Sequence, residues 1–348
     1  MSRRRAFHLS LAFGLAALAA APTALGQSGA LDKVHYRDAD GKVVAVDAAI
    51  TESAAGVQLV TGTKALISPA DVFRIDYGDP KGIAKVDQFA AITLEDGRDP
   101  VKARDTYAGL LKKAGLAAPE RTKRYLSFRE AIWAGKAADA KTGAEFQAEA
   151  PKAAEALAGF ARANKTSWEV WPTARAAARL YAELGDHAKA AALLGELVAV
   201  KGLPRDLHYE AALAEAGALI RAGQRPDAEK RLDQLEKDKD FPATGPARDR
   251  LTVLRVAAKA GDPAKLDQVV AKVTDPTAKA VGVNFLGDAQ LAAGKPREAM
   301  WSYLWADVVY NQDKGEQVYA VGKLVGVFEA LGDKDRAEQF RDRLPRVR

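Results

Sequence analysis

Few side chains in this sequence are of a type and spacing that supports chemistry. C-terminal to Gly26, the histidines His35, His187 and His208 lie far apart in three different expected elements. A metal site needs several such ligands brought together. The segment 38–41 (DADG) resembles the start of a calcium loop, but Tyr36 stands at the first acidic position and no Glu follows in register. We therefore interpret the histidines as exposed or capping side chains and 38–41 as a hairpin turn.

The sequence motifs of nucleotide binding and acyl transfer are missing. There is no G-x-S-x-G, no G-x-G-x-x-G and no cysteine. Gly-Lys pairs begin at Gly41, Gly135, Gly294 and Gly322, but none is followed by the Ser or Thr of a phosphate loop. We expect a protein that is not an enzyme and has no cofactor. An enzyme with two converging carboxylates in a deep pocket is the third alternative.

Two tryptophans stand out in the C-terminal part of the chain. Trp301 and Trp305 are four positions apart, so on a helix they share one stripe. Ala299, Tyr303 and Ala306 form a separate, inner stripe. One interpretation of the tryptophans is packing against the next pair of helices. The other is an aromatic contact patch for a partner, because tryptophan is enriched where binding energy concentrates.

The element that must position these residues is a repeat marked by glycine. Gly185, Gly223 and Gly261 recur with a period of 38, Gly294 follows 33 later, and Gly332 another 38 later. Each closes an Ala- and Leu-rich stretch that reads as a helix. Alanine stands five positions after four of these glycines, at Ala190, Ala228, Ala299 and Ala337. A fixed period near this length predicts stacked helix pairs, since one pair cannot bury its own apolar face.

This spacing resembles the tetratricopeptide repeat, a helix–turn–helix unit of about 34 residues. The match is best around Gly294, where the positions of that motif are taken by Leu286, Gly287, Ala299, Tyr303 and Ala306. The chain departs from the motif in its usual period of 38 and in Leu266, which replaces a small residue. The layout is also similar to a group of exported bacterial repeat proteins that have a small N-terminal β module and no assigned activity. The resemblance implies a binding scaffold and supplies no catalytic residue.

The expected fold is mainly α. We predict a right-handed α-solenoid of about seven helix hairpins over residues 83–345, preceded by a small β module at 30–79. Short runs of strand-forming residues and small turns indicate a five-strand meander, barrel-like because a sheet this small must shelter its edges. Within the solenoid, Gly135 follows Gly97 at the same period of 38 and is expected to end a helix, and Pro151 to begin one.

The resemblance places the inner surface of the solenoid on the first helix of each pair. The side chains expected there are mostly basic: Arg175, Arg179, Arg221, Arg255, Lys259, Asn284 and Asp288. If they share one face, the groove favours carboxylates or an acidic extended segment. The alternative is an ordinary solvated face.

The N-terminus predicts export. Residues 1–26 form a signal peptide with Arg3–Arg5 at its start, an apolar run over 9–21, and small residues before cleavage near Gly26 and Gln27. Ordinary and twin-arginine export both stay open. The net charge of +6 includes those three arginines, so the mature chain carries about +3. That is too balanced to indicate nucleic acid or an anionic membrane as partner.

These features together predict a periplasmic or secreted, non-catalytic scaffold for protein–protein interaction. Its partner is another protein or a peptide segment held on the concave face, acidic or carboxylate-bearing, with no membrane insertion after cleavage. The alternative is a structural component of the cell envelope, whose β module mediates wall, glycan or self association.

Overall fold

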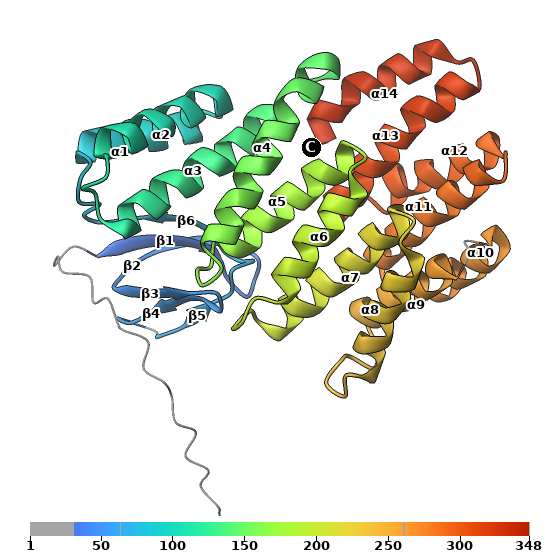
Figure 1. Ribbon diagram of the computed structural model, residues 1–348, viewed down its shortest axis with the longest axis horizontal. Helices are drawn as coiled ribbons and strands as arrows, with labels where there is room; N and C mark the ends of the chain where they lie inside the picture. The colour runs from blue at the N-terminus through green and yellow to red at the C-terminus, as the bar shows by residue number, and fades with distance from the viewer. Residues whose placement is uncertain (1–30, 63, 260–261, 348) are drawn as a thin grey trace, which may run out of the picture.

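The computed structural model describes residues 31–62, 64–259 and 262–347 (Figure 1). The expected signal peptide and the expected turn at Gly261 lie outside these described residues. Within them the chain is mainly helical, with fourteen α-helices that follow a small N-terminal β module.

The β module consists of two three-stranded sheets, with strand orders β2-β1-β6 and β3-β4-β5. Its six described strands replace the expected five-strand meander. The strands are β1 (Asp32–Arg37), β2 (Val43–Ala48), β3 (Ile50–Ser53), β4 (Gly56–Leu59), β5 (Leu66–Ile67) and β6 (Val72–Asp76).

The last strand returns to the first, which is why a simple meander does not form. Val34 on β1 is fully buried and lies opposite Val46 of β2 on one side and Ile75 of β6 on the other. Both neighbours run antiparallel to β1. An apolar residue that is paired on both sides fixes the register, because a one-residue slip would turn it to solvent.

The helices succeed one another along the chain with short connections. Their bounds are α1 (Lys85–Asp96), α2 (Pro100–Ala114), α3 (Glu120–Asp139), α4 (Gly143–Ala163), α5 (Val170–Glu183), α6 (His187–Val198), α7 (Arg205–Arg221), α8 (Arg225–Lys237), α9 (Pro246–Ala258), α10 (Pro263–Lys272), α11 (Pro276–Ala292), α12 (Pro296–Leu304), α13 (Lys314–Ala330) and α14 (Lys334–Val347). A short π-helix, η1 (Trp305–Val309), extends α12.

Four of the repeated glycines end helices in the way their spacing predicted. Gly185, Gly223, Gly294 and Gly332 have φ values of 80°, 77°, 71° and 79°. After each, the next N–H donates to the carbonyl five residues earlier, at 2.8–2.9 Å. This is the Schellman ending, which satisfies carbonyls at the end of a helix and favours glycine because the left-handed conformation costs it little.

Two expected boundaries in the first half of the chain are wrong. Gly135 lies inside α3 and Pro151 lies inside α4. A Cβ on Gly135 would come 3.2 Å from Leu157 Cδ1. Gly135 therefore serves the approach of α3 to α4 rather than a turn.

One apolar core runs from the β module through most of the helices. It begins at Val34 and extends to Leu286 of α11. A second cluster joins α10 to α14 and centres on the fully buried Tyr303. The β module is therefore continuous with the helical part and is not an independent core.

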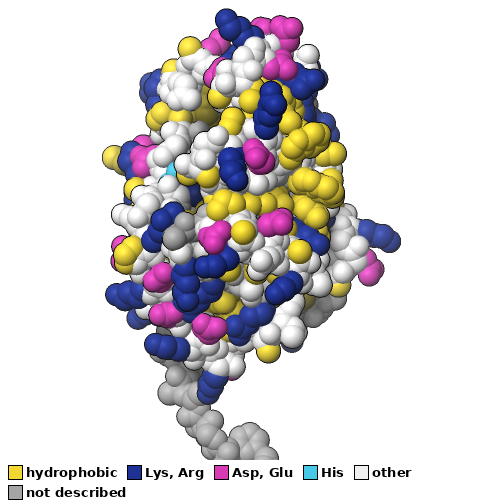
Figure 2. All heavy atoms as spheres, turned by 90° about the vertical axis from the view of Figure 1, so that its right-hand side faces the viewer, with side chains coloured by type: hydrophobic (Ala, Val, Ile, Leu, Met, Phe, Trp, Pro, Cys, Tyr) yellow, Lys and Arg dark blue, Asp and Glu magenta, His cyan; other side chains and the backbone are white. Residues whose placement is uncertain are grey.

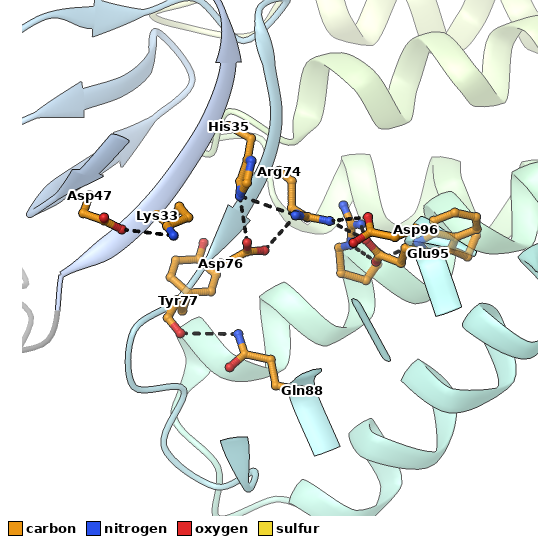
Figure 3. Close-up of polar contacts among 11 residues, drawn as sticks. Lys33, His35, Asp47, Arg74, Asp76, Tyr77, Gln88, Glu95 and Asp96 are labelled. Carbon is orange, nitrogen blue, oxygen red and sulfur yellow. Dashed lines mark hydrogen bonds and ion pairs between the residues drawn. The ribbon is translucent and has the colours of Figure 1, made fainter. Parts of the chain in front are cut away.

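Polar contacts also join the β module to the first helices (Figure 3). Arg74 on β6 has Nε 2.9 Å from Asp76 Oδ1 and donates from Nη1 to Asp96 Oδ1 on α1 at 3.0 Å. His35 Nε2 lies 2.8 Å from Asp76 Oδ2. Arg121 of α3 pairs with Asp32 of β1, with Nη2 2.7 Å from Oδ2. These charges fix the module against α1 and α3.

The Gly287→Ala variant tests how closely α11 and α12 approach. A Cβ at this position would lie 2.7 Å from the ring of Tyr303. We expect the variant to lose about 1–3 kcal/mol of unfolding free energy through overpacking, although alanine favours helix. The control is Gly326→Ala on α13, which meets nothing within 4 Å and should gain about 0.5–1 kcal/mol. Urea denaturation measures both, and an unchanged Gly287→Ala would contradict the packing argument.

Candidate functional site: a central cavity

A cavity of about 420 Å³ lies between helices that are far apart in the sequence. We call it the central cavity. Its walls come mainly from α5, α7 and α13, and α13 contacts α5 directly. Figure 1 shows α13 and α14 returning towards the middle of the molecule, beside α5. A second cavity of about 660 Å³ shares five lining residues with it, namely His187, Arg221, Phe285, Tyr319 and Lys323.

A buried ion pair joins the two sides of the central cavity. Arg221, the last residue of α7, pairs with Glu316 in the first turn of α13 at 2.7 Å. The guanidinium also lies over the rings of Tyr319 and Phe285, 4.0 and 4.8 Å from their centroids. Asn284 Nδ2 donates to Glu316 Oε2 at 2.8 Å.

The environment of Glu316 keeps it ionised. Burial alone raises the pKa of a carboxyl group, but the charge and hydrogen bonds of Arg221, together with Asn284 and the charge of Arg250, outweigh it and lower the pKa of Glu316. Glu316 in turn raises the pKa of Arg221 against the opposing effect of burial. The pair is therefore a fixed, preorganised feature of the cavity wall.

Other cations of the cavity wall also have carboxylate partners. Arg175 pairs with Glu210 at 3.0 Å, and Arg179 pairs with Asp139 at 2.6 Å and with Glu183. Since each positive charge is already matched, these arginines do not make the cavity strongly basic. They contribute more through shape and hydrogen bonding than through net charge.

Arg250 of α9 is different. It lines the central cavity, yet across residues 31–62, 64–259 and 262–347 no carboxylate lies within ion-pair distance of it. Its Nε is buried without a hydrogen-bond partner in this part of the chain. Among the cations that line the described cavity it is the one without a carboxylate within 4.0 Å, although its charge still contributes to the lowered pKa of Glu316.

His187, the first residue of α6, lies where the two cavities meet. Burial is the main cause that lowers its pKa to about 4, and the charges of Arg221 and Lys323 add to it. Its ring centroid is 6.2 Å from that of Tyr319. At neutral pH this imidazole is uncharged and can donate or accept a hydrogen bond according to its tautomer.

The structure brings together some of the residues that the sequence singled out. Arg175, Arg179 and Arg221 line the central cavity. Asn284 is fully buried beneath it and bonds to Glu316. Arg255 instead pairs with residues of α8, and Lys259 is an exposed residue at the end of α9. The partners of Arg255 are Asp233 and Glu236, each at 2.5 Å.

Arg250 and Arg255 belong to the same helix but differ in the direction that they face. Residues five positions apart on an α-helix point in directions about 140° apart, so the two arginines of α9 lie on different faces. The resemblance fixes offsets from the turn glycine, here Gly261, but not the rotation of α9 within the fold. On α9 the expected inner residues are Arg255 and Lys259, and the sequence alone does not indicate that Arg250 faces the cavity instead.

The tryptophans lie away from the cavity, on the surface. Trp301 on α12 is 62% exposed and Trp305 in η1 is 50% exposed, so packing against the next helix pair is the wrong interpretation for both. The Trp305 ring stacks on Tyr310 with centroids 5.9 Å apart. Figure 2 views the end of the molecule that carries α12 and shows hydrophobic side chains gathered on it. A role of this surface in binding a partner stays a prediction.

The described residues hold no group of three or more His, Cys, Asp or Glu side chains arranged to bind a metal ion. None of the described helices combines the length and the apolar character that crossing a bilayer requires. Comparison with models of protein families and with curated proteins finds no match to this chain. The arguments about function therefore rest on the cavity itself.

Proposed function

We propose that this protein is a non-catalytic scaffold for protein–protein interaction, which holds a segment of a partner in the central cavity. The observation that carries the proposal is the cavity of about 420 Å³ with aromatic walls and arginines fixed by ion pairs. Of these pairs, Arg221 with Glu316 is the largely desolvated one, and binding energy concentrates at anchors of that kind. Preorganised side chains also lose little freedom when a ligand arrives.

The architecture favours the same function. We infer that the fourteen helices are seven hairpins of a right-handed solenoid similar to the tetratricopeptide repeat. The four Schellman endings and the small residues five positions later support this. Solenoids of stacked pairs offer a long inner surface to other proteins. The features of residues 1–26 support a place in the periplasm or outside the cell.

The charges within the cavity favour binding over acid–base catalysis. Glu316 has a lowered pKa and a fixed arginine partner, so it is a poor proton donor near neutral pH. His187 is the one imidazole lining the described cavity, and its pKa of about 4 leaves it a weak base. The paired arginines and carboxylates of the cavity wall, beside its apolar side chains, suit a partner segment that carries both polar and apolar side chains and ends in an acidic group.

Filling the cavity tests the proposal. Ala214 of α7 lines the central cavity and is only partly buried, so Ala214→Trp should occupy the space without disturbing the core beneath. We expect capture of partners from an envelope fraction to fall at least tenfold, which corresponds to about 1.4 kcal/mol of binding free energy. Quantitative co-purification measures the effect.

The matched control places the same side chain elsewhere. Ala156 of α4 is exposed and does not line the cavity, so Ala156→Trp should leave capture unchanged. Thermal unfolding of both variants checks that each is folded. Equal capture by folded Ala214→Trp and wild type would contradict the proposal.

A further inference from the structure

We propose that the wall of the central cavity around Arg250, Arg221 and His187 binds the carboxylate of an organic acid with an apolar body. The inference rests on the proposed function, because it assigns the chemical group that the same cavity recognises.

The first argument is that one cation of the cavity wall has no close carboxylate partner. Among the five cations lining the described cavity, Arg175, Arg179, Arg221 and Lys323 each face a carboxylate within 4.0 Å. Arg250 has none within that distance among the described residues. Arg250 acts on Glu316 only through its charge, so its guanidinium can still take a ligand carboxylate as a close hydrogen-bonded partner.

The second argument is a set of buried polar atoms without partners. Arg250 Nε, Arg221 Nε and His187 Nδ1 are all buried, and none has a hydrogen-bond partner in the described chain. All three residues line the same cavity. Buried polar groups are almost always satisfied, so three such atoms lining one cavity indicate a place where a ligand can bind. A carboxylate offers two oxygens that accept several hydrogen bonds and a charge that matches arginine.

The third argument concerns the remainder of the cavity wall. Beside the polar groups it presents apolar and aromatic side chains, among them Trp171, Ala178, Val281, Phe285 and Leu344. An acid whose body is hydrocarbon would bury that body against these residues while its carboxylate reaches Arg250. Ligand sites commonly combine an apolar lining with a few placed polar groups in this way.

The position of His187 makes binding depend on pH. Its ring faces Arg221 from α7, Lys323 and Tyr319 from α13 and Asp288 from α11, with Asp186 preceding it. The two cations oppose its protonation, and a bound anion offsets them. A ligand's negative charge therefore raises the pKa of His187 above its free value of about 4. By linkage, affinity increases as pH falls towards the pKa of the bound state.

The first experiment uses octanoate as the probe and octanol as its uncharged counterpart. We expect saturable octanoate binding by calorimetry, with octanol at least tenfold weaker. Arg250→Gln should reduce octanoate affinity at least tenfold. The control is Arg248→Gln, on the same helix, where the arginine lies over Phe241 and outside the cavity; it should bind as wild type does. Equal affinity of Arg250→Gln and wild type, or equal binding of octanol, would overturn the proposal.

The second experiment isolates the histidine with octanesulfonate, whose charge does not change between pH 7 and 5. Wild type should bind it several-fold more tightly at pH 5, and His187→Gln should lose this dependence. Imidazole NMR should show the pKa of His187 rising when the ligand is added. A pKa that stays at its free value in the saturated complex would contradict the role of His187.

A third arm separates a free acid from the end of a polypeptide. An apolar hexapeptide with a free carboxyl terminus is compared with its amide. Preference for the free terminus shows that a partner can supply the carboxylate, whereas octanoate binding alone assigns the site to a small acid; both support the inference. If Ala214→Trp reduces partner capture but Arg250→Gln changes the binding of neither octanoate nor the peptide, this inference fails and the scaffold proposal stands. If octanoate binding depends on Arg250 but Ala214→Trp leaves partner capture unchanged, the scaffold proposal fails and this inference stands.

Discussion

Replacing Arg129 with Met is expected to lower the free energy of unfolding by about 3–5 kcal/mol, because it leaves a buried carboxylate without its partner. Arg129 on α3 and Glu95 on α1 have side chains that are 7% and 4% exposed. Arg129 Nε donates to Glu95 Oε1 at 2.7 Å, and Nη2 donates to Oε2. Trp133 Nε1 donates to Oε1 as well, at 2.8 Å. Urea denaturation at pH 7 measures the loss.

The double variant Glu95→Leu/Arg129→Met distinguishes charge from packing. Removing both charges leaves neither ion of the pair buried alone, and the remaining loss is the acceptor of Trp133 Nε1, so stability should return to within about 1–2 kcal/mol of wild type. If the double variant is as unstable as the single one, the contribution of this pair is packing and the electrostatic account is wrong.

Acid provides a second check on the same pair. Burial raises the pKa of Glu95, but the charge and hydrogen bond of Arg129 outweigh it, so the folded pKa is lowered. A lowered carboxyl pKa contributes stability above the unfolded value of about 4.3. That contribution is lost as pH falls below about 4.3 through the folded value. The double variant should show less of this acid destabilisation than wild type.

The location of this pair also bears on how the β module is studied. Glu95 lies within 3.8 Å of Arg74 on β6, and the module shares its apolar core with the helices. Removing residues 31–79 would expose that core, so deletion cannot separate the module's function from its part in stability. Point variants on the outer face of the module are the appropriate tools.

Local signals were enough to predict the mainly helical class, the N-terminal β module and four of the helix endings. A glycine after an Ala- and Leu-rich stretch can end a helix because it readily adopts the left-handed conformation that a helix ending requires, as Gly185 and Gly223 do. Gly135 has the same spacing but lies inside α3, because its role is to let Leu157 of α4 approach. A sequence period does not distinguish a glycine needed for its backbone from one needed for its size.

The central cavity could be predicted only in part. Arg175 and Arg179 follow from the repeat, since they lie on the first helix of one pair. The pairing of Arg221 with Glu316 joins positions 95 apart, and nothing local to either residue indicates it. Arg250 depends on how α9 is rotated about its own axis. Contacts made by tertiary closure set these features, and a single sequence does not report them.

The closure of the cavity gives the second large expected effect. Arg221→Met should cost about 3–5 kcal/mol at pH 7, because Glu316 would stay buried and charged beside Asn284. Without Arg221, we expect burial to outweigh the hydrogen bond of Asn284 and the charge of Arg250, so that the pKa of Glu316 rises above its usual value, the reverse of the wild-type shift. A carboxyl with a raised folded pKa destabilises the protein above that pKa and does so less as pH falls through it.

The variant should therefore regain stability relative to wild type between pH 7 and 5, whereas Glu316 in wild type loses its contribution only below about pH 4.3. His187 works in the same direction, because removing Arg221 removes one cause of its lowered pKa. Urea denaturation at both pH values measures the difference. The double variant Arg221→Met/Glu316→Leu isolates the contribution of the carboxyl group. It should be more stable than the single variant at pH 7. Between pH 7 and 5 it should regain less stability, because the part that Glu316 supplies is absent. A single variant whose deficit is the same at pH 7 and 5 would show that Glu316 does not remain buried, and that α13 separates from α7 when the ion pair is removed.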